Sequence, residues 1–243
     1  MDAVSKWCRE NELILNLKKG KTEMMIFGTS QKLKKLTSPI KIYFNNQLIK
    51  TTEQYNYLGS LLDCSLNFNK NFDRAYKKCS SRLRLLMKIR QFIDTFTAKT
   101  IHRSMVMPVM TYCGVMNLNL YHTYRLKLQS LDRRSNVIVN AFSLKNVQLQ
   151  SIENYNKKRA CLLVSKILND NCCNAFRGYF DVFDNERQTR NNKSLIRLPK
   201  VHTEIGRKSF YFFAARTFNA LPCNIRNDYR NADFKTHLNL HFA

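Results

Sequence analysis

The chain has 243 residues, of which 44% are hydrophobic and 12% aromatic, and it contains only 6 Gly and 4 Pro. A chain of this length and composition can bury a core, which excludes a disordered tail protein. Its 41 Lys plus Arg and 17 Asp plus Glu give a net charge of +24. This excess favours a polyanionic partner, first of all RNA or DNA. The alternatives are a basic surface that serves solubility and an acidic protein partner.

The eight cysteines form no C-x-x-C pair, and most of them lie in apolar periodic stretches. We therefore expect reduced, mostly buried thiols and an intracellular location, in the nucleus or the cytoplasm. Charged residues occupy the N-terminal segment, where a signal peptide would be apolar. The longest apolar run, 105–116, is too short to cross a bilayer, so no membrane partner is expected.

The first part of the chain begins with a helical pattern and continues with β-prone runs. Residues 3–8 show helical spacing, and this helix is expected to end near Asn11. Two short β-prone runs, 13–16 and 24–27, flank a basic turn. Residues 28–39 are predicted to form a polar loop.

A hairpin signal follows this loop. Asn45 and Asn46 separate the β-prone runs 40–44 and 47–50, and asparagine tolerates the positive φ angles of a tight turn. One further strand is expected over 54–62. The strand signals are confined to this part of the chain, so any sheet is expected to be small.

The hydrophobic period then changes to that of helices. It predicts a long basic amphipathic helix over 69–91, a second helix over 97–117 with a disturbance at Pro108, and a third over 124–142. These three helices are expected to form a bundle. A fourth helix is predicted over 148–169.

The remainder of the chain is predicted to be less regular. It has an Arg- and Asn-rich stretch over 187–193, an extended segment over 195–201 and a compact final unit over 209–242. The expected fold is therefore α+β and mainly helical, with a small antiparallel β-hairpin patch, a helical bundle and an irregular C-terminal region. The expected domain ranges are 1–66, 67–145 and 146–243.

Several short motifs follow one another along the chain. In its first part they are residues 7–11, Leu15-Asn16, Lys21-Thr22, residues 24–27, Tyr57-Leu58-Gly59 and Leu62-Asp63. Near its end they are Arg190-Asn191, Leu198-Pro199, Arg207-Lys208-Ser209-Phe210, Phe218-Asn219-Ala220-Leu221-Pro222 and Phe234-Lys235. In this order they resemble motifs D and E, the thumb and the C-terminal region of reverse transcriptases of non-LTR (LINE-type) retrotransposons. The resemblance covers essentially the whole chain.

The resemblance implies a fragment of an RNA-directed DNA polymerase that binds an RNA, DNA or RNA–DNA hybrid template-primer. In the intact polymerase, carboxylates hold two magnesium ions. Those carboxylates would precede Met1, and the sequence contains no Asp-Asp pair. This chain alone is therefore expected to bind no cofactor and to be inactive as a polymerase. The alternatives are a co-opted, non-enzymatic nucleic-acid-binding protein and a decayed element fragment without function.

By the same resemblance, two places in the first part of the chain are candidate site residues. Lys21 matches the motif D lysine that faces the departing pyrophosphate, and the alternative is a solvated lysine of a basic turn. Tyr57, Leu58 and Gly59 match the primer grip, a hairpin that presses against the primer, where glycine permits close backbone approach. The alternative is that Tyr57 and Leu58 pack inward and Gly59 forms a bulge. The isolated Asp63 is expected to orient backbone or solvent, because magnesium sites need more than one anionic ligand.

The helix predicted over 69–91 resembles the thumb that grips a duplex. Between Asn69 and Arg103 there are 10 Lys plus Arg and 2 Asp plus Glu. Contact with phosphates is favoured over simple solvation, because the charges are nearly all of one sign. The residues expected to make these contacts are Arg74, Lys77, Lys78, Arg82, Arg84 and Lys88.

Two weaker groups complete the candidates. His237 and His241 are four residues apart, but no tightly spaced Cys or His accompanies them, so we expect no zinc site. The aromatic run 210–213 and Phe218 could stack on unpaired bases. Their spacing with Ala214, Ala215 and Leu221 is more typical of a hydrophobic core.

Overall fold

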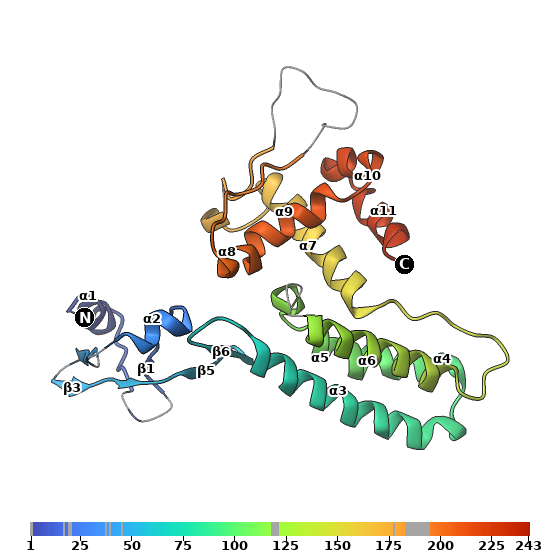
Figure 1. Cartoon of the computed structure of the whole chain (residues 1–243), viewed down its shortest axis with the longest axis horizontal. Helices are drawn as coiled ribbons and strands as arrows, with labels where there is room; N and C mark the ends of the chain where they lie inside the picture. The colour runs from blue at the N-terminus through green and yellow to red at the C-terminus, as the bar shows by residue number, and fades with distance from the viewer. Residues whose placement is uncertain are drawn as a thin grey trace. The chain divides into compact units, whose positions relative to one another are not determined.

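The computed structural model describes residues 2–16, 18, 21–36, 38, 40–44, 46–117, 122–176, 178–182 and 195–243. Within these residues the chain is mainly helical, with short strand pairs in its first part (Figure 1). The expected α+β, mainly helical fold is therefore confirmed. Contacts divide the chain into two compact units, unit 1 with residues 1–71 and unit 2 with residues 72–243.

The described residues of unit 1 form two short helices, of which one was predicted. They are α1 (Asp2–Glu10) and α2 (Ser30–Lys34). The predicted end of α1 near Asn11 is confirmed. The loop predicted over 28–39 is wrong where α2 forms, because the Thr29 hydroxyl accepts a hydrogen bond from the Lys32 amide at 3.2 Å and so caps a helical turn.

The strands of unit 1 form three separate pairs. In chain order they are β1 (Glu23–Met24), β2 (Tyr43–Phe44), β3 (Gln47–Leu48), β4 (Lys50–Thr51), β5 (Gln54–Tyr57) and β6 (Ser60–Asp63). The predicted hairpin between 40–44 and 47–50 is confirmed, since β2 pairs antiparallel with β3 and Asn46 has a φ of 60°. Asn45 lies outside the described residues. Residues 13–16 form no strand, and β1 pairs in parallel with β4.

The segment expected to be one strand over 54–62 is a two-stranded hairpin. Strand β5 pairs antiparallel with β6, and Tyr57 lies opposite Ser60 across a two-residue turn. Leu58 and Gly59 in this turn have φ angles of 46° and 85°. Positive φ at both positions is the signature of a type I′ turn, whose twist matches that of the flanking strands.

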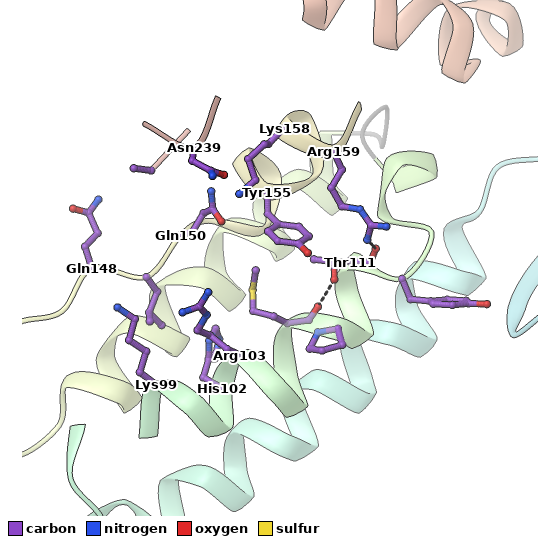
Figure 2. A pocket seen from close by; sticks show the side chains of 15 residues that line it. Lys99, His102, Arg103, Thr111, Gln148, Gln150, Tyr155, Lys158, Arg159 and Asn239 are labelled. Atoms are coloured by element: carbon purple, nitrogen blue, oxygen red, sulfur yellow. Dashed lines mark hydrogen bonds between the residues drawn. The ribbon is translucent and has the colours of Figure 1, made fainter. Parts of the chain in front are cut away.

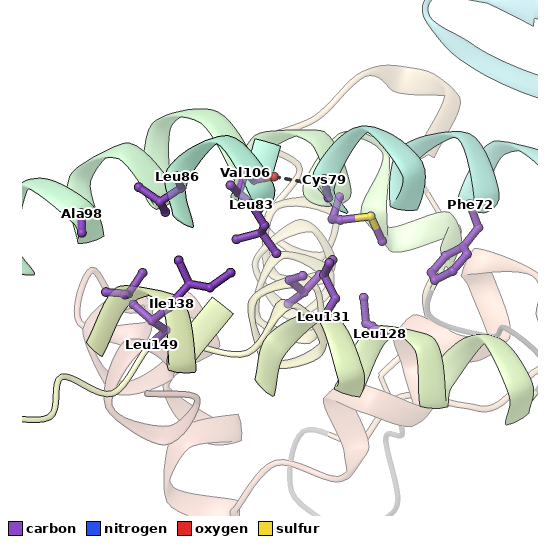
Figure 3. Packing of buried hydrophobic residues seen from close by; sticks show 13 residues of the cluster. Phe72, Cys79, Leu83, Leu86, Ala98, Val106, Leu128, Leu131, Ile138 and Leu149 are labelled. Carbon is purple, nitrogen blue, oxygen red and sulfur yellow. Dashed lines mark hydrogen bonds between the residues drawn. The ribbon is translucent and has the colours of Figure 1, made fainter. Parts of the chain in front are cut away.

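Unit 2 begins with the predicted bundle. Its elements are α3 (Asn69–Ile89), η1 (Arg90–Phe92), α4 (Thr95–Ile101), η2 (His102–Val106), α5 (Met107–Thr111), η3 (Gly114–Asn117) and α6 (His122–Asn140). Their inward faces form one hydrophobic cluster (Figure 3). Its fully buried members include Phe72, Cys79, Leu83, Ala98, Leu131 and Val139.

The disturbance predicted at Pro108 is confirmed, and it lies in the segment just before this residue. Proline has no backbone N–H and its ring clashes with the preceding turn of an α-helix. Residues His102–Val106 accordingly form a π-helical turn, η2, directly before α5, which starts at Met107. The second helix of the bundle is thus made of three pieces, and α5 ends at Thr111 where the sequence pattern had predicted helix as far as residue 117.

A second hydrophobic cluster lies in the C-terminal part of unit 2. It is built on α7 (Ile152–Leu168), which the Ser151 hydroxyl caps by accepting a hydrogen bond from the Asn154 amide at 3.1 Å. The remaining elements are η4 (Asn174–Phe176), α8 (Glu204–Lys208), α9 (Phe210–Asn219), α10 (Cys223–Asn227), η5 (Asp228–Arg230) and α11 (Phe234–His241). Val182 and Ile196 form an isolated antiparallel bridge. The Arg- and Asn-rich stretch 187–193 lies outside the described residues.

All eight cysteines are free thiols. The expectation that most of them are buried is wrong, because only Cys8, Cys79 and Cys161 are. Burial raises the pKa of the Cys79 and Cys161 thiols to about 12, which leaves both protonated and unreactive at neutral pH. In the described part of the chain, no helix combines the length and the hydropathy that a bilayer crossing requires.

Candidate nucleic-acid interface

Helix α3 has a buried apolar face and an exposed basic face. Phe72, Cys79, Leu83 and Leu86 are at most 2% exposed and hold the helix in the bundle. Five cations of the same helix are exposed. Lys70 lies in its first turn, and we call the other four the α3 basic face: Lys77, Lys78, Arg84 and Lys88. Burying one face of a helix in a core leaves the other face to solvent, so the hydrophobic period also positions these charges.

The charges of the α3 basic face are arranged along the helix axis. Lys77, Arg84 and Lys88 are separated by seven and four residues, that is, by about two turns and one turn, so they share one side of α3. At a rise of 1.5 Å per residue, this row is about 17 Å long. Lys78 lies beside the row.

The only carboxylate of α3 is engaged elsewhere. Asp73 accepts a hydrogen bond at 3.0 Å from the Lys127 ammonium of α6, and the Tyr124 hydroxyl lies 3.4 Å from it. This hydrogen bond raises the pKa of Lys127. Among the described residues, no ion pair joins a carboxylate to any member of the α3 basic face. The charge of this face is therefore open to an external anion.

The other two predicted contact residues of α3 are placed differently. Arg82 is half-buried, and its Nη1 donates a hydrogen bond to the carbonyl oxygen of Met105 in η2. Its guanidinium thus helps to hold α3 against η2. Arg74 is also half-buried, one turn before Lys78. The structure brings four of the six predicted cations together on exposed surface and assigns Arg82 a contact within the fold.

Arg90, just after α3, is a structural cation that the sequence did not reveal. It is 3% exposed, and its Nε donates to the Val139 carbonyl oxygen at 3.1 Å. Its Nη2 donates to the Thr95 hydroxyl at 2.9 Å, and its Nη1 to the Ile93 carbonyl oxygen. Ile93 and Thr95 lie within five residues of Arg90, but Val139 is 49 residues away, and its position beside Arg90 is set by the packing of α6, which the local sequence does not contain.

The hairpin formed by β5 and β6 carries the predicted primer-grip residues at its tip. Tyr57 is 57% exposed and Leu58 is 75% exposed. Gly59 lies in the turn itself, with its φ of 85°. The alternative in which Tyr57 and Leu58 pack inward around a Gly59 bulge is therefore excluded. Contact of these three residues with a primer stays a prediction.

Lys21 lies in an exposed turn. Its amide donates to the Lys18 carbonyl oxygen at 3.0 Å, and the Tyr55 hydroxyl donates to the Lys21 carbonyl oxygen at 3.4 Å. Lys19 and Gly20 lie outside the described residues. The backbone of the turn is thus tied to β5 while the Lys21 side chain is exposed. Its role toward pyrophosphate stays a prediction.

Asp63 orients backbone, as expected. Its carboxylate accepts hydrogen bonds from the Asn67 amide at 3.1 Å and the Phe68 amide at 3.0 Å, and from both the amide and the hydroxyl of Ser65. Burial tends to raise the pKa of Asp63, but these hydrogen bonds outweigh it and lower the pKa. The carboxylate therefore shapes the connection between β6 and α3. No group of three or more metal-binding side chains occurs among the described residues.

The weaker candidates are used within the fold. The Nδ1 of His237 lies 3.2 Å from a carboxylate oxygen of Asp228. Phe218 is fully buried, with its ring 6.1 Å from that of Tyr229, which confirms the core interpretation for this residue. The ring of Tyr211 in α9 packs 5.3 Å from that of Phe180.

No protein-family model, curated protein or solved structure matches this chain. The resemblance to reverse transcriptases thus stays a prediction from the sequence motifs. What the structure adds is local: an exposed hairpin tip in unit 1 and the α3 basic face in unit 2.

Proposed function

We propose that the chain binds nucleic acid duplexes and that the α3 basic face contacts their phosphates. The observation that carries this proposal is the exposure of Lys77, Lys78, Arg84 and Lys88 without a carboxylate partner among the described residues. The sequence of unit 2 adds a broad positive field, with 30 Lys plus Arg against 11 Asp plus Glu. Such a field steers a polyanion toward the protein before contact is made.

The dimensions of the α3 basic face suit a duplex. Duplex DNA carries one negative charge per about 3.4 Å of each strand, so a row about 17 Å long spans about five phosphates of one strand. Lysine and arginine contacts to phosphate position a protein without reading sequence. RNA, DNA and RNA–DNA hybrid are therefore all ligands of this surface, and affinity falls steeply as salt displaces them.

The role we assign to this binding is that of the thumb of a LINE-type RNA-directed DNA polymerase. The order of the motifs in the sequence supports this role, as does the succession of a hairpin with an exposed tip and a helical bundle with a basic helix. The 243 residues contain no Asp-Asp pair, so this chain alone should extend no primer. Magnesium-dependent synthesis above background would contradict that expectation.

Salt titration of duplex binding tests the proposal. The logarithm of the binding constant to an RNA–DNA hybrid, measured by fluorescence anisotropy, is plotted against the logarithm of the salt concentration. Changing the four cations of the α3 basic face to Gln should make the slope less negative by about 3 to 4. The matched control changes four exposed cations on other parts of unit 2 to Gln: Arg133, Lys145, Lys166 and Arg216. It removes the same charge and should change the slope by less than about 1. Equal slopes for the two variants would contradict the proposal that the α3 basic face contacts the phosphates.

A further inference from the structure

Unit 2 also holds a concave basic site, which we call the α4–α7 cavity. Its volume is about 670 Å³, and it lies between the helical segment made of α4, η2 and α5 and the first turns of α7 (Figure 2). Lys99 and Arg103 line it from the first segment, and Lys158 and Arg159 line it from α7. No Asp or Glu is among its lining residues. Ala243 also lines it, but no ion pair of the described residues joins the carboxylate of Ala243 to these cations.

His102 is a buried polar side chain without a partner in the wall of this cavity. It is 3% exposed, and neither of its ring nitrogens has a hydrogen-bond partner in the described structure. Burial lowers its pKa to about 4, so the ring is neutral at neutral pH. Both ring nitrogens are closed to solvent, so His102 contributes a neutral ring to the wall behind the cations.

Tyr155 gives the cavity an aromatic wall and helps to position its cations. The Lys158 ammonium lies 5.3 Å from the centre of the Tyr155 ring, and the Arg159 guanidinium 6.0 Å from it. Arg159 also donates to the Thr111 carbonyl oxygen at 3.4 Å (Figure 2). Opposite them, His102 and Arg103 lie in the π-helical turn η2, a local geometry that is rare in ordinary helices and frequent at functional sites.

The cations of this site repel one another in the absence of an anion. Burial is the main cause that lowers the pKa of Lys158, and the positive charges of Arg103 and Lys235 lower it further. These three residues come from η2, α7 and α11, so the fold itself collects them. Like charges held together cost free energy, which an anion between them recovers.

We propose that the α4–α7 cavity binds the phosphate of a ligand of about nucleotide size. The volume lies in the range of small-molecule sites, about 300 to 1,000 Å³. Two arginines and two lysines supply charged donors for phosphate oxygens, and the Tyr155 ring supplies an apolar wall. The phosphate belongs either to a free nucleotide or to the 5′ end of a strand. The inference is independent of the proposed function, because it uses none of the α3 cations.

Calorimetric titration of the full chain tests this proposal with pyrophosphate, ATP and adenosine as probes. Pyrophosphate and ATP should bind, and adenosine should bind at least 10-fold more weakly. Changing Arg103 and Lys158 together to Gln should weaken pyrophosphate and ATP about 10-fold or more, because each charge-assisted hydrogen bond contributes about that factor. The matched control, Lys166 and Arg216 to Gln, should change binding less than twofold. Equal weakening by both double variants, or equal binding of adenosine, would overturn the proposal.

Three further readouts complete the experiment. Binding of pyrophosphate should shift the ¹⁵N resonances of the His102 ring, and unchanged resonances would contradict its place in the site. Oligonucleotides with and without a 5′ phosphate identify the source of the bound phosphate. A preference for the phosphorylated strand indicates a strand end. If ATP binds and no such preference is seen, the ligand is a free nucleotide. Either result supports a phosphate site. The variant lacking the four α3 cations should keep its affinity for pyrophosphate within twofold, so failure here is distinguishable from failure of duplex binding.

Discussion

The α3 basic face and the α4–α7 cavity are two basic regions of unit 2 that differ in shape. Each has four cations, but those of α3 stand on a convex helix surface, while those of the cavity surround a space of about 670 Å³. On an open surface, affinity depends on the number of charges and is insensitive to the shape of the anion. In a cavity, cations on several sides make the shape of the anion matter. We therefore expect two kinds of anion binding from two regions of similar composition.

The largest expected effect comes from the core that both regions share. Leu83 of α3 is fully buried in the same cluster as Val106 of η2 and Met110 of α5. Leu83→Ala should lower the free energy of unfolding, measured in urea, by about 4 kcal/mol and weaken both kinds of anion binding. The control is Leu85→Ala, at a residue of the same helix that is 58% exposed, which should cost less than about 1 kcal/mol. Similar costs for the two variants would contradict the assignment of the α3 faces.

Arg90 is a structural cation and can be compared with Lys88, to which we assign a ligand contact. Its guanidinium is buried and donates three hydrogen bonds, so Arg90→Met leaves three acceptors without their donor. We expect a loss of about 3 kcal/mol in unfolding free energy. Lys88→Met, two residues earlier on exposed surface, should leave stability within about 0.5 kcal/mol and instead weaken duplex binding. The reverse pattern in urea unfolding and anisotropy would show that the two cations have been assigned to the wrong roles.

Acid should act on the stability of unit 2 with opposite signs through buried His102 and half-buried Asp132. Burial lowers the pKa of His102 to about 4, so the stability that it contributes is lost as the pH falls from about 6.5 to 4. Burial raises the pKa of Asp132, which accepts from the Ile152 amide, to about 6. The stability that Asp132 contributes therefore increases as the pH falls from about 6 to 4.

Single variants should reveal these two contributions. Relative to the unmodified chain, His102→Gln should become more stable by about 3 kcal/mol as the pH is lowered from 7 to 4. Asp132→Asn should become less stable by about the same amount over the same range. Urea unfolding at several pH values measures both. If the unfolding free energies of all three proteins changed with pH in parallel, neither group would have the shifted pKa that its burial predicts.

The smallest expected effect is that of a change at Gly114, which should affect the α4–α7 cavity and not the α3 basic face. A Cβ on Gly114 would lie 2.3 Å from the Oδ1 of Asn156, a buried residue of α7 two positions before Lys158. Gly114→Ala should therefore shift α7 and cost about 2 kcal/mol of stability. Pyrophosphate binding should weaken while the salt slope for duplex binding stays as it was. A change in the slope with unaltered pyrophosphate binding would contradict the separation of the two sites.

The sequence predicted the helices of unit 2 well because their inward faces repeat at helical spacing. The same helical period predicted the exposed side of α3, and Pro108 indicated the break in the second helix. The strand pattern missed the hairpin of β5 and β6, because Leu58 is not a residue that signals a turn with positive φ, whereas the resemblance to motif E implied a hairpin at Tyr57-Leu58-Gly59. The helical pattern also missed α2, although Thr29 followed by Ser30 is a capping signal that could have revealed it.

The binding regions were less accessible to sequence reasoning than the helices. The half-buried position of Arg82 depends on Met105, which is 23 residues away. The α4–α7 cavity joins Lys99 and Arg103 to side chains of α7 more than 50 residues later, and no local pattern links them. Contacts of this kind are set by tertiary packing, which the period of a single helix does not contain.

Lysine footprinting of the unmodified chain tests duplex binding by α3 most directly. The chain is acetylated with and without an RNA–DNA hybrid, and the reactivity of each lysine is read by mass spectrometry. Lys77, Lys78 and Lys88 should be protected by the hybrid at low salt and released at high salt, whereas the equally exposed Lys145 and Lys166 should react alike in both samples. Unchanged reactivity of the three α3 lysines in a sample whose duplex is fully bound would contradict the proposed interface.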